Sequence, residues 1–111
     1  MFKDDNVRLR HILDAARESV SFAEGRRRAD LDTDRKLNLS LVRLLEVIGE
    51  AARSLSPEFR ETHPTLPWEK MVGMRDRLIH GYYDVNLDVV WETITEDLPP
   101  LIVQLERIVA N

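Results

Sequence analysis

The chain has 111 residues, no cysteine and a formal net charge of −4. This length predicts one domain, residues 1–111, and a hydrophobic content of 43% is enough for an ordinary core. The lack of cysteine excludes disulfides and thiolate zinc sites and suits a reducing compartment. No apolar run approaches the roughly 20 residues that cross a bilayer, and the N-terminus lacks the apolar part of a signal peptide. We therefore expect a cytoplasmic protein with no membrane partner.

The charge is unevenly distributed along the chain. Residues 1–60 contain 12 Lys or Arg and 11 Asp or Glu, whereas residues 61–111 contain 4 and 9. An acidic balance argues against a general nucleic-acid binder, which is normally basic. It still allows an enzyme with a local basic pocket, and an acidic surface suits a chain that docks onto a protein partner.

Two long helices are predicted in the first half of the chain. The first covers about residues 5–28, with one apolar face formed by Val7, Ile12, Leu13, Ala16, Val20 and Ala23. A linker follows, in which Asp32 or Thr33 can cap the next helix. The second covers about residues 34–55 and has the clearest helical pattern, at Leu37, Leu41, Leu44, Leu45, Ile48, Ala52 and Leu55.

A short helix and a third main helix come next. Ser56 is suited to an N-cap and Pro57 to the first helical position, which predicts a short helix through about Glu61. The third main helix is expected from Trp68 to about Ile79, with Gly81 placed where a helix would stop.

The fourth main helix is expected to begin near Asn86, and Pro99-Pro100 should kink or break it. Trp68 and Trp91 fit apolar helix faces, which favours a place in the core over base stacking. No strand is predicted. The sequence therefore predicts an all-α protein, a four- or five-helix up-and-down bundle with short loops.

The most informative motif is formed by Arg75, His80 and Tyr82. An arginine can hold phosphate oxygens through its planar fork of donors, and a histidine can move a proton near neutral pH. Five positions along an ideal helix would set Arg75 and His80 about 140° apart. A loosened helix at Gly81, or a two-fold dimer that gathers both copies of the motif, would bring them to one cleft.

The motif has neighbours that identify a family resemblance. They are Ile48-Gly49-Glu50-Ala51-Ala52, Leu55-Ser56-Pro57-Glu58, Leu66-Pro67-Trp68 and Val90-Trp91. Their order and spacing resemble the HepT-like branch of the HEPN proteins, the toxins of bacterial and archaeal toxin–antitoxin pairs. That family carries R-x4-H-x-Y, which Arg75, His80 and Tyr82 match.

The resemblance implies a HEPN-type bundle, a homodimer and a metal-independent endoribonuclease toxin that cleaves tRNA or mRNA. Arg75 and His80 would then be catalytic, with RNA cut by attack of the ribose 2′-hydroxyl. It also implies a partner, a minimal nucleotidyltransferase antitoxin like MntA, which can AMPylate the tyrosine of this motif. The matching acceptor is Tyr82, and the alternative is that Tyr82 only shapes the site.

Two acidic residues are candidates for supporting roles. Glu46 and Glu50 share one helix face, and Glu50 follows Gly49, so it could face the arginines of the third helix. Asp76 could orient Arg75, although an ion pair with Arg77 or Lys70 is the simpler interpretation. Three scattered histidines give no metal-binding pattern, and no cofactor is implied.

A second function is compatible with the same sequence. The chain could be a non-catalytic helical module that binds a minimal nucleotidyltransferase. The intact set of Arg75, His80 and Tyr82 favours the enzyme, because a scaffold does not need all three.

Overall fold

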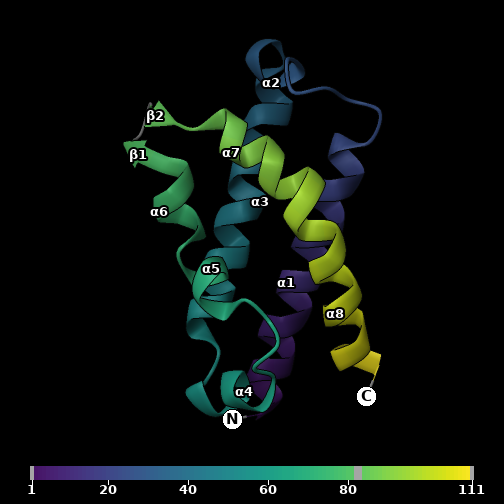
Figure 1. Cartoon of the computed structure of the whole chain (residues 1–111), viewed down its shortest axis with the longest axis vertical. Helices are drawn as coiled ribbons and strands as arrows, with labels where there is room; N and C mark the ends of the chain where they lie inside the picture. The colour runs from purple at the N-terminus through teal and green to yellow at the C-terminus, as the bar shows by residue number, and fades with distance from the viewer. Residues whose placement is uncertain (1, 82–83, 111) are drawn as a thin grey trace.

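The computed structural model describes residues 2–81 and 84–110. Its elements are α1 (Phe2–Ala23), α2 (Asp30–Thr33), α3 (Arg35–Ser54), α4 (Pro57–Thr62), α5 (Trp68–Val72), α6 (Met74–Leu78), β1 (Ile79–Gly81), β2 (Asp84–Val85), α7 (Leu87–Glu92), the π-helix η1 (Thr93–Asp97) and α8 (Leu98–Ala110). The fold is all-α, as predicted, apart from one small hairpin (Figure 1). No helix in the described ranges is long and apolar enough to cross a membrane.

The core lies where α1 and α3 pack together and α8 and the α5–α6 segment cover them. The predicted pattern of the second helix is confirmed, because Leu41, Leu45, Ile48 and Ala52 are fully buried. The prediction for Val7 was wrong, since 47% of this residue is exposed. Leu9 and Ala15 are buried in α1 instead. Trp68 is buried, and Trp91 packs against the core while partly exposed.

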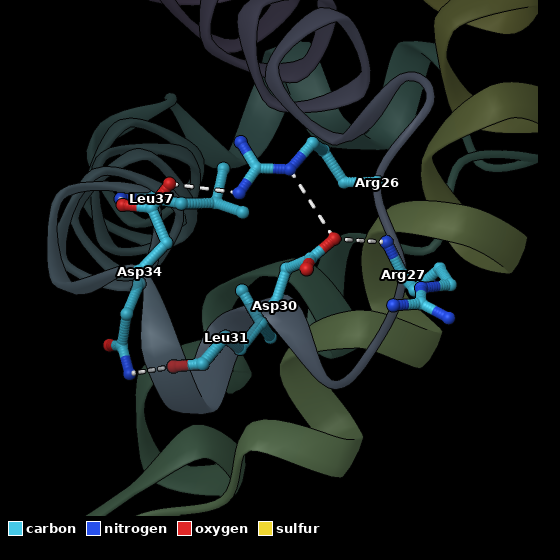
Figure 2. Close-up of polar contacts among 7 residues, drawn as sticks. Arg26, Arg27, Asp30, Leu31, Asp34 and Leu37 are labelled. Atoms are coloured by element: carbon cyan, nitrogen blue, oxygen red, sulfur yellow. Dashed lines mark hydrogen bonds and ion pairs between the residues drawn. The ribbon is translucent and has the colours of Figure 1, made fainter.

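The first helix ends five residues earlier than predicted, at Ala23. Gly25 adopts a φ of 73°, a left-handed conformation that ends helices and that glycine takes without steric cost. The arginines that follow therefore do not extend the helix. Arg26 lies instead between two aspartates, with Nη2 2.8 Å from Asp34 and Nε 3.3 Å from Asp30 (Figure 2).

The predicted linker contains one helical turn, α2, and the cap of α3 is Asp34 rather than Asp32 or Thr33. The Asp34 side chain accepts a hydrogen bond from the backbone N–H of Leu37. The Arg26 guanidinium, followed by that backbone donor, lowers the pKa of the Asp34 carboxyl. Arg28 bridges α2 to α7, because it contacts both Asp32 and Asp88.

The short fourth helix forms as predicted, over Pro57–Thr62, with the Ser56 side chain accepting from the N–H of Phe59. The same serine is tied to the start of α1. The Asp5 carboxylate, only 1% exposed, accepts hydrogen bonds from the Ser56 N–H at 2.9 Å and from its Oγ at 2.7 Å. The start of α1 and helix α4 lie at the same end of the bundle (Figure 1).

The third predicted helix is divided and shorter than expected. Gly73, with φ −81° and ψ 2°, separates α5 from α6, and glycine is a poor residue for a helix interior. The helix ends at Leu78, not at Ile79, and the chain continues into an antiparallel hairpin in which Ile79 pairs with Val85. The prediction that the chain has no strand was therefore wrong. Local propensity does not reveal a pairing between two such short segments.

The fourth predicted helix begins after Asn86, whose side chain caps the N–H of Val89. It changes to a π-helix ahead of Pro99-Pro100, and the N–H of Leu98 bonds to the carbonyl of Thr93. Proline has no N–H to give to the preceding turn, and π-helical segments inside α-helices are a known way to change the hydrogen-bond register. The expected disruption thus lies just before the prolines, while the ribbon stays continuous (Figure 1).

Candidate active site

Arg75 lies on α6, and 55% of its side chain is exposed. Its Nε is 3.6 Å from Oε2 of Glu46, which comes from α3. The guanidinium therefore stands at the surface with a carboxylate beside one end of its donor fork. In the part of the chain that the structure describes, no other ion pair uses its remaining donors, which suit a ligand such as phosphate.

His80 lies on β1, outside the helix that carries Arg75. The expectation that Gly81 loosens a helix at His80 was wrong, because α6 ends at Leu78 and Gly81 has no left-handed φ. The extended backbone of β1 frees the imidazole from helical geometry. Its Nδ1 is 3.9 Å from Oδ2 of Asp84 on β2, with side-chain exposures of 54% and 76%.

Asp84 was not identified from the sequence. Asp84 lies four residues after His80, on the strand that pairs with β1, and this relation appears only once the pairing of the two strands is known. The Asp84 carboxylate thus lies on the Nδ1 side of the imidazole ring. Tyr82, the proposed AMP acceptor, lies outside the described residues.

The carboxylate beside Arg75 is that of Glu46, and the prediction that Glu50 faces the arginine was wrong. Glu50 is exposed and lies 4.0 Å from Arg43 of its own helix. Gly49 does permit the close helix approach that was expected, since a Cβ there would lie 3.2 Å from the carbonyl oxygen of Met71. That approach places α6 beside the turn of α3 that carries Glu46.

Asp76 is exposed on α6, next to Arg75. The expected alternative partner, Lys70, pairs instead with Asp97 at 3.1 Å. In the ranges that the structure describes, no ion pair joins Asp76 to Arg77, and no group of three His, Asp or Glu side chains could hold a metal ion.

A groove of about 430 Å³ runs between α1 and α3, beside the helix face that carries Glu50. Val7, Val47 and Ala51 form its apolar part, and Arg8, His11, Arg43, Asp4 and Glu50 add charged groups. Gly49 and Ala52 are buried inside the protein and offer no surface for self-association. Val47 and Ala51 of α3 line this groove, and Leu39, which is 52% exposed, adds apolar surface elsewhere on the same helix.

Comparison with known proteins gives one consistent result. The family model described as "Ribonuclease HepT-like" matches residues 12–108. A "putative RNase" of Caldanaerobacter subterraneus subsp. tengcongensis is 42% identical over 100 residues, which cover 90% of this chain and 89% of the relative. The "probable ribonuclease HepT" of Thermococcus cleftensis is 40% identical over 79 residues, covering 71% and 72%. No solved structure matches the chain. The chain belongs to the HepT-like family of the HEPN superfamily.

Proposed function

We propose that this chain, a single HepT-like domain, is a metal-independent endoribonuclease that acts as the toxin of a type VII-like toxin–antitoxin pair. Its substrate is cellular RNA, tRNA or mRNA, and it acts in the cytoplasm. The observation that carries the proposal is the joint exposure of Arg75 and His80 on one short segment, α6–β1, in a chain of the HepT-like family.

The reaction that fits these groups is an internal transesterification. The ribose 2′-oxygen attacks the adjacent phosphorus, the bond from phosphorus to the 5′-oxygen breaks, and the products are a 2′,3′-cyclic phosphate and a 5′-hydroxyl. His80 takes the proton from the 2′-hydroxyl or gives one to the leaving 5′-oxygen. Arg75 stabilises the additional negative charge on the phosphorane-like transition state.

One histidine cannot easily act as base and acid in the same step, so the active form is a homodimer with both motifs at a shared cleft. The charges on α3 support this. Arg43 and Glu50 are 64% and 63% exposed and lie on either side of Val47. If two α3 helices meet in opposite directions about Val47, each Arg43 faces the Glu50 of the other copy. Glu46, and with it Arg75, then lies close to the two-fold axis.

Purified protein and a mixed RNA substrate test the catalytic assignment. His80→Ala and Arg75→Ala should each lose cleavage by roughly 10²–10⁴-fold, and their expression should no longer slow bacterial growth. His63→Ala and Arg77→Ala are matched controls of the same residue types. Wild-type cleavage or toxicity in a folded His80→Ala protein would refute the role of His80 and leave the non-catalytic module as the better interpretation.

Mixing two inactive variants tests the shared cleft. A heterodimer of Arg75→Ala and His80→Ala brings one arginine and one histidine to the shared cleft but lacks the second histidine, so activity should return in part on mixing. Independent sites would give no recovery. Light scattering should show a dimer, and Glu50→Arg should weaken it by placing like charges together. The double variant Arg43→Glu/Glu50→Arg should restore it.

Neutralisation by a cognate minimal nucleotidyltransferase is the regulatory part of the proposal. AMP on Tyr82 would add a phosphate that can pair with Arg75, and an adenosine that blocks RNA entry. Co-expression with the transferase should increase the intact mass by one or more AMP units, lost in Tyr82→Phe and retained in Tyr83→Phe. Neutralisation of Tyr82→Phe without a mass increase would mean inhibition by docking alone.

A further inference from the structure

Glu46 differs from the other carboxylates near the candidate site in its burial. Only 21% of its side chain is exposed, against 63% for Glu50 one turn later on the same helix. A carboxylate largely withdrawn from water requires a compensating partner. Among the described residues, the ion-pair partner of Glu46 is Arg75, at 3.6 Å.

The fold fixes this carboxylate more firmly than the arginine. Glu46 lies on α3 within one helical turn of Leu45 and Ile48. Leu45 and Ile48 are fully buried in the core, so this turn of the helix is held firmly in place. Gly49 allows the backbone at Met71 to approach α3 closely, and α6 follows directly after α5. Arg75, by contrast, has a flexible side chain that is more than half exposed. An arginine of this kind samples many rotamers when it is not held by a partner.

The direction of the contact matters for phosphate binding. Glu46 approaches the Nε of Arg75, and among the described residues no ion pair engages the terminal Nη groups. Those two groups form one of the edges with which a guanidinium can hold two phosphate oxygens. The carboxylate thus restricts the rotation of the arginine without occupying its outer edge.

We propose that Glu46 is a positioning residue for the RNA-cleavage reaction, which holds the Nε end of Arg75 so that its Nη edge points to the scissile phosphate. The inference rests on the proposed function of Arg75. Because Glu46 acts through orientation, its loss lowers the rate of the chemical step. Because it carries a negative charge, its loss does not weaken the attraction of the site for RNA.

The test compares Glu46→Ala and Glu46→Gln with Glu106→Ala. Glu106 is the matched control, because it forms a glutamate–arginine pair between α8 and α1, 2.6 Å from Arg17 and away from the motif. We expect kcat to fall by about 10- to 100-fold in Glu46→Ala, the range that loss of reactive geometry gives. Glu46→Gln, which keeps an oxygen for Nε, should retain more activity, and Glu106→Ala should cleave like wild type.

Three further measurements separate positioning from a structural role. The KM of Glu46→Ala, and its Kd for an RNA whose 2′-hydroxyls are methylated, should stay equal to wild type or decrease. The unfolding midpoint should match that of Glu106→Ala. In an Arg75→Lys background, which keeps the cation but lacks the planar fork, Glu46→Ala should change kcat by less than about two-fold.

The inference is overturned if Glu46→Ala cleaves like wild type, if its loss of kcat is the same in the Arg75→Lys background, or if weakened RNA binding or unfolding accounts for the whole loss. These results are distinct from failure of the proposed function, which would appear as wild-type cleavage by Arg75→Ala itself.

Discussion

The buried carboxylate of Asp5 provides a quantitative test of how the bundle is held together. It accepts two hydrogen bonds from Ser56, at 2.9 Å and 2.7 Å, and so joins the first turn of α1 to the cap of α4. Hydrogen bonds to a charged group contribute about 1.5–3 kcal/mol each, and a buried donor left without an acceptor costs about 1–3 kcal/mol. Because Ser56 is only partly buried and water can replace part of the interaction, we expect Asp5→Ala to cost about 2–3 kcal/mol.

This cost can be converted into a change of melting temperature. An unfolding entropy of about 2.1 cal/mol/K per residue makes 1 kcal/mol equal to about 4 °C for a chain of this size. Asp5→Ala should therefore melt about 8–13 °C below wild type at pH 7, with Asp5→Asn in between because its amide keeps one acceptor. Asp4→Ala is the control, since Asp4 is the exposed neighbour.

The effect should also depend on pH in a defined direction. Burial raises the pKa of Asp5, but the hydrogen bonds from Ser56 outweigh it, so the folded-state pKa lies below the ordinary value of 3.8. A lowered carboxyl pKa stabilises the fold above the unfolded-state pKa, and this contribution is lost as the pH falls through the folded-state pKa. Thermal unfolding should show the gap between wild type and Asp5→Ala narrowing below about pH 4. Equal melting of Asp5→Ala and Asp4→Ala at pH 7 would refute the reasoning.

Three further predictions follow from the same structure. The Arg26 side chain lowers the pKa of the Asp34 carboxyl, and the backbone N–H of Arg27 is the main cause that lowers the pKa of Asp30. The stability that these carboxylates contribute should therefore be lost as the pH falls through their folded-state pKa values. In thermal scans, Asp34→Asn should lose less stability than wild type below about pH 4. A curve for Asp34→Asn parallel to wild type would contradict this. Gly25→Ala should cost about 1–2 kcal/mol in urea unfolding because of the left-handed φ of 73°, whereas Gly81→Ala, where a Cβ meets no atom within 4 Å, should change stability by less than about 0.5 kcal/mol. Cleavage should persist in EDTA and leave cyclic phosphate ends, because the proposed reaction uses only an arginine and a histidine; strict dependence on added magnesium would contradict the mechanism.

The sequence by itself determined the features that depend on neighbouring residues. The spacing of Leu41, Leu45, Ile48 and Ala52 predicted the buried face of α3, because the helical period is a local property. Ser56-Pro57 predicted the start of α4 from capping chemistry alone. The motif and its neighbours were also sufficient for the HepT-like assignment, since they are fixed patterns along the chain.

The tertiary structure decided which groups meet. Glu46 and Glu50 are equivalent in the helical pattern, and only the placement of α6 against α3 selects Glu46 as the partner of Arg75. His80 lies on a strand because β1 pairs with β2. The strand propensity of the segment around His80 does not by itself predict this pairing. In the sequence, nothing distinguishes Asp5 from other acidic residues in the first turn of a helix. Its hydrogen bonds form because the fold places Ser56, the N-cap of α4, beside it. For Glu46 and Asp5 the stabilising partner is distant in sequence, so no local pattern could reveal it.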